Sequence, residues 1–197
     1  MKKLLIIVFL TFMLFGCGKN EKTDTNDKAI VIYFSRAGEN YSVGNVDVGN
    51  TAIMASYIKD YLKCDSFEIV PEVPYSDVYD EVYVQANTEK QEQARPAIKN
   101  KIDNLKDYNT IFLGYPIWCN DLPMIMYTFM ETYDLSNKTI IPFNTHEKSK
   151  SAGTYEIIQK LLPNSKVNLN GLYLTGSEAR TEDGRKKTVQ WLKSLGY

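Results

Sequence analysis

The sequence predicts an α/β fold in which a parallel sheet is covered by helices on both faces. Five short apolar segments, rich in residues that favour strands, alternate along the chain with longer stretches whose apolar residues recur at helical spacing. This alternation is typical of parallel sheets, because the crossover between two parallel strands is usually a helix. No internal repeat interrupts the pattern, and 197 residues are enough for one domain with a short N-terminal extension.

The first half of the chain supplies two strands and three helices. Residues 29–34 are nearly all apolar, as expected of a strand that is buried on both faces. Apolar residues recur every three or four positions over residues 50–63, which predicts a helix. A short strand follows at residues 67–70, and then a loop rich in proline and tyrosine. Two further helices are expected at residues 82–94 and, opened by a proline, at residues 96–105.

The second half continues the alternation of strands and helices. Its strands are expected at residues 110–115, at residues 138–143 and within residues 167–174. Its helices are expected at residues 123–133, 154–162 and 181–195. Pro116 closes the first of these strands, since proline cannot donate to a sheet ladder.

Composition and charge exclude several classes of protein. Hydrophobic residues make up 44% of the chain, which is enough to build a core and excludes a disordered protein. The 23 basic and 24 acidic side chains nearly balance, so the basic surface typical of nucleic-acid binding is not expected. Three cysteines and one histidine are too few for a disulfide scaffold or a histidine-rich metal site. The Gly-x-Ser-x-Gly motif of many hydrolases is also missing.

The N-terminus has the features of an export signal. Two lysines precede about a dozen apolar residues and a glycine. This run is shorter than the roughly 20 residues of a membrane-spanning helix, so a cleaved signal is favoured over a buried strand or an uncleaved anchor. Residues 14–17 resemble the lipobox of bacterial lipoproteins, which implies a signal at residues 1–16 and lipidation of Cys17. Residues 17–28 are then a polar tether, and residues 29–197 a domain outside the cytoplasm, anchored to the bacterial membrane.

Three loops are expected at the carboxyl ends of the strands, where open parallel sheets bind their ligands. The loop after the first strand contains Ser35 and ends in Gly49, Asn50 and Thr51 at the start of a helix. Backbone N–H groups, hydroxyls and the helix dipole at such a place can bind a phosphate. A simpler interpretation is that Asn50 or Thr51 only caps the helix. The intervening residues 41–48 are expected to form a small hairpin.

The loops after the third and fourth strands carry a tryptophan and the single histidine of the chain. Trp118 offers a flat surface on which a planar ring can stack, although tryptophan also packs commonly in protein cores. Backbone groups of residues 118–121 can reach the polar edge of such a ring. Thr145, His146 and Glu147 follow the fourth strand and can hydrogen-bond a heteroaromatic rim, but a structural role for a lone histidine stays open.

Together these loops resemble those of the flavodoxin-like family, in the branch with a long, interrupted phosphate loop. The resemblance covers nearly the whole chain after the tether and depends on five segments in order: residues 33–41, residues 48–51, residues 94–96, residues 112–118, and residues 140–143 with Thr145 and His146. It implies a flavodoxin-like three-layer sandwich with a five-stranded parallel sheet in order 2-1-3-4-5. It also implies non-covalent binding of flavin mononucleotide (FMN).

The resemblance assigns cofactor-binding residues to each loop. The phosphate loop corresponds to Ser35, Arg36, Gly49, Asn50 and Thr51. The loop beside the isoalloxazine ring corresponds to Pro116, Ile117, Trp118, Cys119, Asn120 and Asp121, and the loop on its other side to Thr145 and His146. This sequence departs from the pattern at two places. Cys119 stands where a second aromatic residue is common, and residues 147–150 stand where glycines are common.

The predicted function is that of an FMN-binding redox protein that passes electrons to an unidentified partner protein or small acceptor. Two alternatives stay open: a flavin-free binding lipoprotein with the same fold, and an FMN-dependent NAD(P)H-quinone-type reductase. Nothing in the sequence resembles a separate nicotinamide-binding domain, which favours electron transfer. Cys64 and Cys119 are expected to be thiols, because one ends the first long helix and the other lies at the flavin edge.

Overall fold

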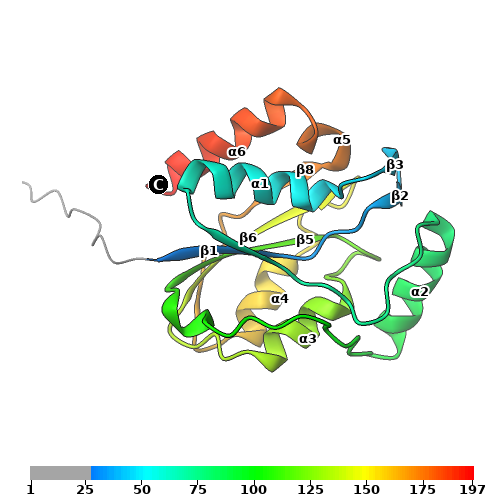
Figure 1. The fold of residues 1–197 in the computed structure, drawn as a ribbon, viewed down its shortest axis with the longest axis horizontal. Helices are drawn as coiled ribbons and strands as arrows, with labels where there is room; N and C mark the ends of the chain where they lie inside the picture. The colour runs from blue at the N-terminus through cyan, green and yellow to red at the C-terminus, as the bar shows by residue number, and fades with distance from the viewer. Residues whose placement is uncertain (1–27) are drawn as a thin grey trace, which may run out of the picture.

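The computed structural model describes residues 28–197, in which helices pack on both faces of a central sheet (Figure 1). The predicted signal at residues 1–16 and the lipidation site Cys17 lie outside the described residues, as does the predicted tether except Lys28. Within residues 28–197, no helix has the length and hydrophobicity that a membrane crossing requires.

The described part of the chain contains a central sheet of six parallel strands. These are β1 (Ala29–Tyr33), β4 (Asp65–Glu68), β5 (Thr110–Pro116), β6 (Thr139–His146), β7 (Lys166–Val167) and β8 (Leu172–Thr175). Their order is β4-β1-β5-β6-β7, and β8 pairs with the second half of β6, beyond β7. With β7 and β8 taken as one interrupted edge strand, this order is the predicted 2-1-3-4-5, which is confirmed.

The interruption of the edge strand differs from the prediction of one strand within residues 167–174. Between β7 and β8, the Oδ1 atom of Asn168 accepts a hydrogen bond from the backbone N–H of Asn170 at 2.9 Å. Asparagine favours such local turns, because its side chain bonds the backbone two residues further on. The chain therefore leaves the sheet at this turn and returns to β6 as β8.

The helices divide into three groups around the sheet. On one face lie α1 (Asn50–Leu62), α5 (Gly176–Ala179) and α6 (Glu182–Ser194), and on the other lie α3 (Met124–Thr132) and α4 (Thr154–Leu161) (Figure 1). Beyond the strand ends, α2 (Tyr79–Gln91) lies beside the hairpin of β2 (Gly38–Asn40) and β3 (Gly44–Val46) (Figure 1).

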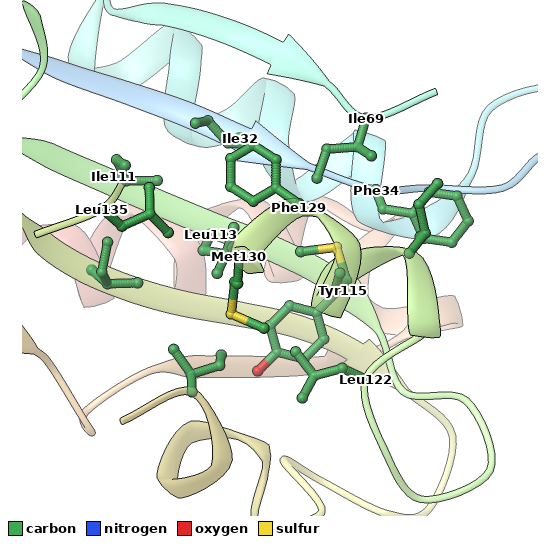
Figure 2. Close-up of a cluster of buried hydrophobic side chains, with 14 of the residues drawn as sticks. Ile32, Phe34, Ile69, Ile111, Leu113, Tyr115, Leu122, Phe129, Met130 and Leu135 are labelled. Atoms are coloured by element: carbon green, nitrogen blue, oxygen red, sulfur yellow. The ribbon is translucent and has the colours of Figure 1, made fainter. Parts of the chain in front are cut away.

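Alternate residues of the central strands enter two separate cores, so these strands are buried on both faces as predicted. Ile32 of β1 packs in the core of α3 and α4, whereas its neighbour Val31 packs in the core of α1 and α6. Figure 2 shows the first of these cores, in which Tyr115 of β5 and Phe129 of α3 lie among apolar side chains of the sheet, of α3 and of the loops beside them. This two-sided burial fixes the sheet and thereby the positions of the loops that follow its strands.

One predicted helix is wrong. Residues 96–105 are not helical, and only a single 3₁₀ turn, η1 (Leu105–Asp107), forms at their end. The Oδ1 atom of Asn100 accepts a hydrogen bond from the Val70 N–H at 3.0 Å, and its Nδ2 atom donates to the Glu68 carbonyl at 2.7 Å. These bonds attach the segment to the end of β4, in place of the bonds that it would make to itself in a helix.

Tertiary contacts also move the bounds of other elements. The strand predicted at residues 67–70 begins and ends two residues earlier, as β4 (Asp65–Glu68). The helix predicted at residues 82–94 begins three residues earlier, at Tyr79, whose N–H donates to Oε2 of Glu39 at 3.0 Å. The carboxylate of Glu39, on the hairpin, thus bonds a free N–H group of the first turn of α2. The predicted hairpin exists and extends from Gly38 to Val46.

Candidate functional site

A cavity of about 460 Å³ opens at the carboxyl ends of the central strands, between the hairpin, α2 and the loops after β5 and β6. The predicted cofactor-binding residues that line it are Arg36, Asn50, Pro116, Ile117, Trp118, Cys119, Asn120, Thr145 and His146. The others, Ser35, Gly49, Thr51 and Asp121, hydrogen-bond or contact residues near the cavity rather than lining it. The structure therefore brings the three predicted loops together at one site.

The start of α1 is built by residues from two different strands. The Oγ atom of Ser35, just after β1, accepts a hydrogen bond from the Ala52 N–H at 3.0 Å. The simpler interpretation, that Asn50 or Thr51 only caps the helix, is wrong, because both lie inside it and Gly49 is the N-cap. Thr51 instead shares a hydrogen bond of 2.8 Å with Thr145 of β6.

Gly49 permits the close approach of these two segments. A Cβ atom at this position would lie 2.2 Å from Ser35 Oγ and 2.5 Å from the Arg36 carbonyl oxygen. Any larger residue would push the loop after β1 away from the N-terminus of α1. The geometry leaves the positive end of the helix dipole beside the cavity, as anion-binding sites require.

Two arginines donate hydrogen bonds to residues around the start of α1. Arg180, which follows α5, donates from Nη1 to Oδ1 of the buried Asn50 at 2.9 Å and to the Val48 carbonyl at 2.8 Å. Arg36 donates from Nη1 to the Ser76 carbonyl at 2.8 Å, which connects the loop after β1 to the segment before α2. Sequence reasoning missed Arg180, because its contact with Asn50 joins residues 130 positions apart.

Trp118 takes part in the core and in the cavity wall. Its half-buried ring meets Phe34 edge-on at 5.3 Å between ring centroids and Tyr75 at 4.9 Å. It also lines the cavity, so Trp118 is at once a core residue and part of the cavity wall, and its stacking with a ligand ring stays a prediction. The core contacts fix the ring plane, since edge-to-face pairs have a preferred geometry.

Residues 118–121 form a tight turn. Trp118 and Asp121 exchange two backbone hydrogen bonds, of 3.0 and 2.9 Å. Between them, Cys119 and Asn120 have φ values of 50° and 58°. This is the left-handed region, which costs a residue other than glycine about 1 kcal/mol. Asp121 supports the turn, because its Oδ1 atom accepts from Tyr127 at 2.9 Å and from the Leu122 N–H at 2.8 Å.

Three tyrosines form a cavity wall that sequence reasoning missed. Tyr41 on the hairpin and Tyr79 at the start of α2 have ring centroids 5.6 Å apart, and Tyr79 and Tyr83 lie 6.4 Å apart and stacked. All three line the cavity. The spacing of four residues between Tyr79 and Tyr83, in a helix that follows a strand end, is the signal that identifies this wall.

His146 ends β6 and lines the cavity, and one of its ring nitrogens is buried without a partner within residues 28–197. Its ring lines the cavity and meets Tyr173 at 5.4 Å between centroids. The Nδ1 atom is buried and has no hydrogen-bond partner among the described residues. A buried polar atom without a partner is unfavourable, so this nitrogen costs the folded protein stability. The next residue, Glu147, accepts from the Gly176 N–H at 3.2 Å.

His146 should make the stability of the protein depend on pH. Burial lowers the pKa of its ring, Lys150 lowers it further, and only Glu178 opposes them. The unfolded chain therefore binds this proton at higher pH than the folded protein does. The free energy of unfolding should fall from about pH 7 to about pH 5, because the unfolded state binds more protons there. In urea titrations, His146→Asn should show a smaller fall than the wild type. Equal falls in the two proteins would contradict this assignment.

The two cysteines in the described residues are free. Cys64 lies just after α1, and Cys119 lies in the turn at the cavity. Burial raises the pKa of both thiols above the usual value. Within residues 28–197, no group of three or more His, Cys, Asp or Glu side chains is placed to hold a metal ion.

Comparison with known protein families identifies the family of this chain. The family model described as Flavodoxin matches residues 28–193, nearly all of the described chain. The chain belongs to the flavodoxin family. This membership confirms the resemblance that the five sequence segments and the three loops indicated. No curated protein matches the chain.

Solved structures share the flavodoxin fold. A candidate flavoprotein from Bacteroides eggerthii DSM 20697 is 28% identical, with a TM-score of 0.69, over 87% of this chain and 99% of its own. Another, from Bacteroides uniformis ATCC 8492, is 28% identical with a TM-score of 0.69, and the match covers 85% of this chain and 99% of the other. A flavoprotein from Lactobacillus acidophilus NCFM, solved in complex with FMN, is 18% identical with a TM-score of 0.60. The match covers 84% of this chain and 98% of the other.

Proposed function

We propose that this flavodoxin-family protein binds FMN non-covalently in the cavity and carries electrons between redox partners. The observation that carries the proposal is the cavity itself, which has an anion-binding helix start at one side and aromatic side chains at the other. A flavoprotein of the same fold from Lactobacillus acidophilus contains FMN. When bound, the flavin supplies the electron chemistry, and the protein supplies binding, orientation and electrostatics.

The phosphate of FMN would bind at the start of α1. Ser35 and Gly49 pack the loop after β1 closely against this helix start, and Asn50 in its first turn lines the cavity. Arg36 lines the cavity and adds a positive charge, and the helix dipole favours the anion. The residues present therefore fit a phosphate monoester.

The isoalloxazine ring would bind between Trp118 and the tyrosines of α2. Aromatic faces favour stacking with a flat heteroaromatic ring. His146, at the end of β6, lines the cavity beside the rim of such a ring. Tyr41 and Tyr83, which are 49% and 54% exposed, leave the cavity accessible to a redox partner.

Tryptophan fluorescence tests FMN binding directly. The chain has two tryptophans, and Trp191 packs in the core of α1 and α6, away from the cavity. In a Trp191→Phe variant, Trp118 is the only tryptophan, and we expect FMN to quench its emission with a dissociation constant of about 1 μM or lower. Emission that FMN leaves unchanged would favour a flavin-free binding protein. Oxidation of NADPH by the FMN-loaded protein alone would favour the reductase instead.

We further propose that Cys17 carries the lipid that anchors the domain outside the cytoplasm. The support is the sequence of residues 1–17, which combines a signal with a lipobox-like end. Cys17→Ser removes the lipid, and acyl chains supply most of the membrane affinity of a lipoprotein. The variant should therefore either move from the membrane fraction to the soluble fraction or keep residues 1–16 uncleaved. Cys64→Ser is the matched control and should leave the protein in the membrane fraction. A Cys17→Ser protein that stays in the membrane fraction with residues 1–16 removed, as Cys64→Ser should, would contradict lipidation at Cys17.

A further inference from the structure

Lys90, in the last turn of α2, reaches the tight turn of residues 118–121. Its Nζ atom donates to the Cys119 carbonyl at 2.8 Å and lies 3.4 Å from Oδ2 of Asp121. The Lys90 side chain is 36% exposed and that of Asp121 is 16% exposed, so water screens this pair only in part. No prediction from the sequence involved Lys90.

The ion pair balances two charges beside the cavity wall. Asp121 contributes a negative charge and Lys90 a positive one, and the turn between Trp118 and Asp121 lies against both. Both charges act on the thiol of Cys119, a residue that lines the cavity. Lys90 lowers the pKa of this thiol and Asp121 raises it. The charges of the pair therefore act at the surface that faces the ligand.

We propose that Lys90 sets how strongly this site prefers reduced over oxidised FMN. This inference rests on the proposed binding of FMN in the cavity. Two-electron reduction of the ring with uptake of one proton adds one negative charge, which the site must accommodate. Lys90 offsets the charge of Asp121, so the turn meets the reduced ring with a neutral pair and not with a bare carboxylate. Lys90 is thus a positioning and electrostatic residue, which acts through the turn that it holds.

Two substitutions separate this charge effect from a structural effect. Lys90→Met removes the positive charge and leaves Asp121 unpaired, and Asp121→Asn removes the negative charge and leaves Lys90 unpaired. Both break the same ion pair, so a loss of structure would change the midpoint potential of bound FMN in the same direction. The charge effect requires opposite directions.

The experiment measures this midpoint potential under anaerobic reduction with dithionite and a reference dye. For Lys90→Met, we expect the affinity for reduced FMN to fall about tenfold relative to oxidised FMN, which lowers the potential of this two-electron couple by about 30 mV. Asp121→Asn should raise it. Lys90→Arg keeps the positive charge and should have the same midpoint potential as the wild type.

A matched control removes the same charge elsewhere. Lys160 occupies the last turn of α4, as Lys90 does in α2, and Lys160→Met should leave the potential unchanged. If the wild type binds FMN but Lys90→Met and Asp121→Asn shift the potential in the same direction or not at all, the inference is wrong and the proposed function stands. A wild type that binds no FMN contradicts both.

Discussion

Replacing Ser35 with aspartate should lower the affinity for FMN at least about a hundredfold while the fold is retained. The new carboxylate would lie beside the site proposed for the phosphate, and like charges in contact cost several kcal/mol, of which about 3 kcal/mol corresponds to a hundredfold. Stability should change little, because aspartate can accept the Ala52 N–H as serine does and its charge suits a helix N-terminus. Titrations with FMN, alongside circular dichroism, measure both effects.

Riboflavin and Ser35→Ala provide the controls for this prediction. Riboflavin lacks the phosphate, so its affinity should fall much less than that of FMN in Ser35→Asp. Ser35→Ala removes the acceptor for the Ala52 N–H, which should cost about 1 kcal/mol of stability. It adds no charge and should weaken FMN binding less than aspartate does. An equal loss of FMN and riboflavin affinity in Ser35→Asp would place the phosphate elsewhere.

Phe34→Ala should affect stability and the site together. Phe34 is 1% exposed and packs against Tyr75 and Trp118, at ring-centroid distances of 5.7 and 5.3 Å. Truncating a buried phenylalanine to alanine costs about 3–5 kcal/mol, which urea unfolding measures. The substitution also removes an edge-to-face contact that fixes Trp118. We therefore expect FMN affinity to fall by about tenfold, the equivalent of 1.4 kcal/mol.

Phe129→Ala is the matched control for this second prediction. Phe129 lies in the same core and is fully buried, but its aromatic contact is with Tyr133 of the segment after α3 and not with Trp118 (Figure 2). The loss of stability should be similar in both variants, whereas FMN affinity should fall only in Phe34→Ala. If both variants lose affinity alike, a general loosening of the core explains the effect, and the support of Trp118 by Phe34 does not.

The central strands could be predicted because their burial on both faces leaves continuous apolar runs in the sequence. The strand predicted at residues 29–34 is observed as β1, and those at residues 110–115 and 138–143 as β5 and β6. Strand order came from the resemblance to the flavodoxin-like family, since periodicity carries no information about which strands are neighbours. The carboxyl ends of β1, β5 and β6 then place the three loops around one cavity.

Long-range hydrogen bonds explain what the sequence did not predict. Asn100 bonds Glu68 and Val70, so the segment predicted as a helix from Pro96 is held in an irregular conformation. Ser35, and not Asn50 or Thr51, bonds the first turn of α1 from 17 residues away. The sequence indicates which side chains can form hydrogen bonds with the backbone. Which backbone group each one bonds depends on how the sheet assembles.

The tyrosine wall and Lys90 were missed for a related reason. Both belong to α2, whose place beside the hairpin depends on contacts such as Glu39 with the Tyr79 N–H. A helix pattern alone predicts that one side is buried, but not which other element covers it. The candidate site therefore extends beyond the three loops to one side of α2.

Absorbance of the purified protein after mixing with FMN and desalting tests the account most directly. We expect flavin bands in the near-ultraviolet and the blue to stay with the wild type, because the proposed site would hold the phosphate and the ring at separate ends of the cavity. They should be lost from Ser35→Asp. A folded wild type that retains no flavin under these conditions would contradict FMN binding at this site and indicate a binding protein that shares the flavodoxin fold.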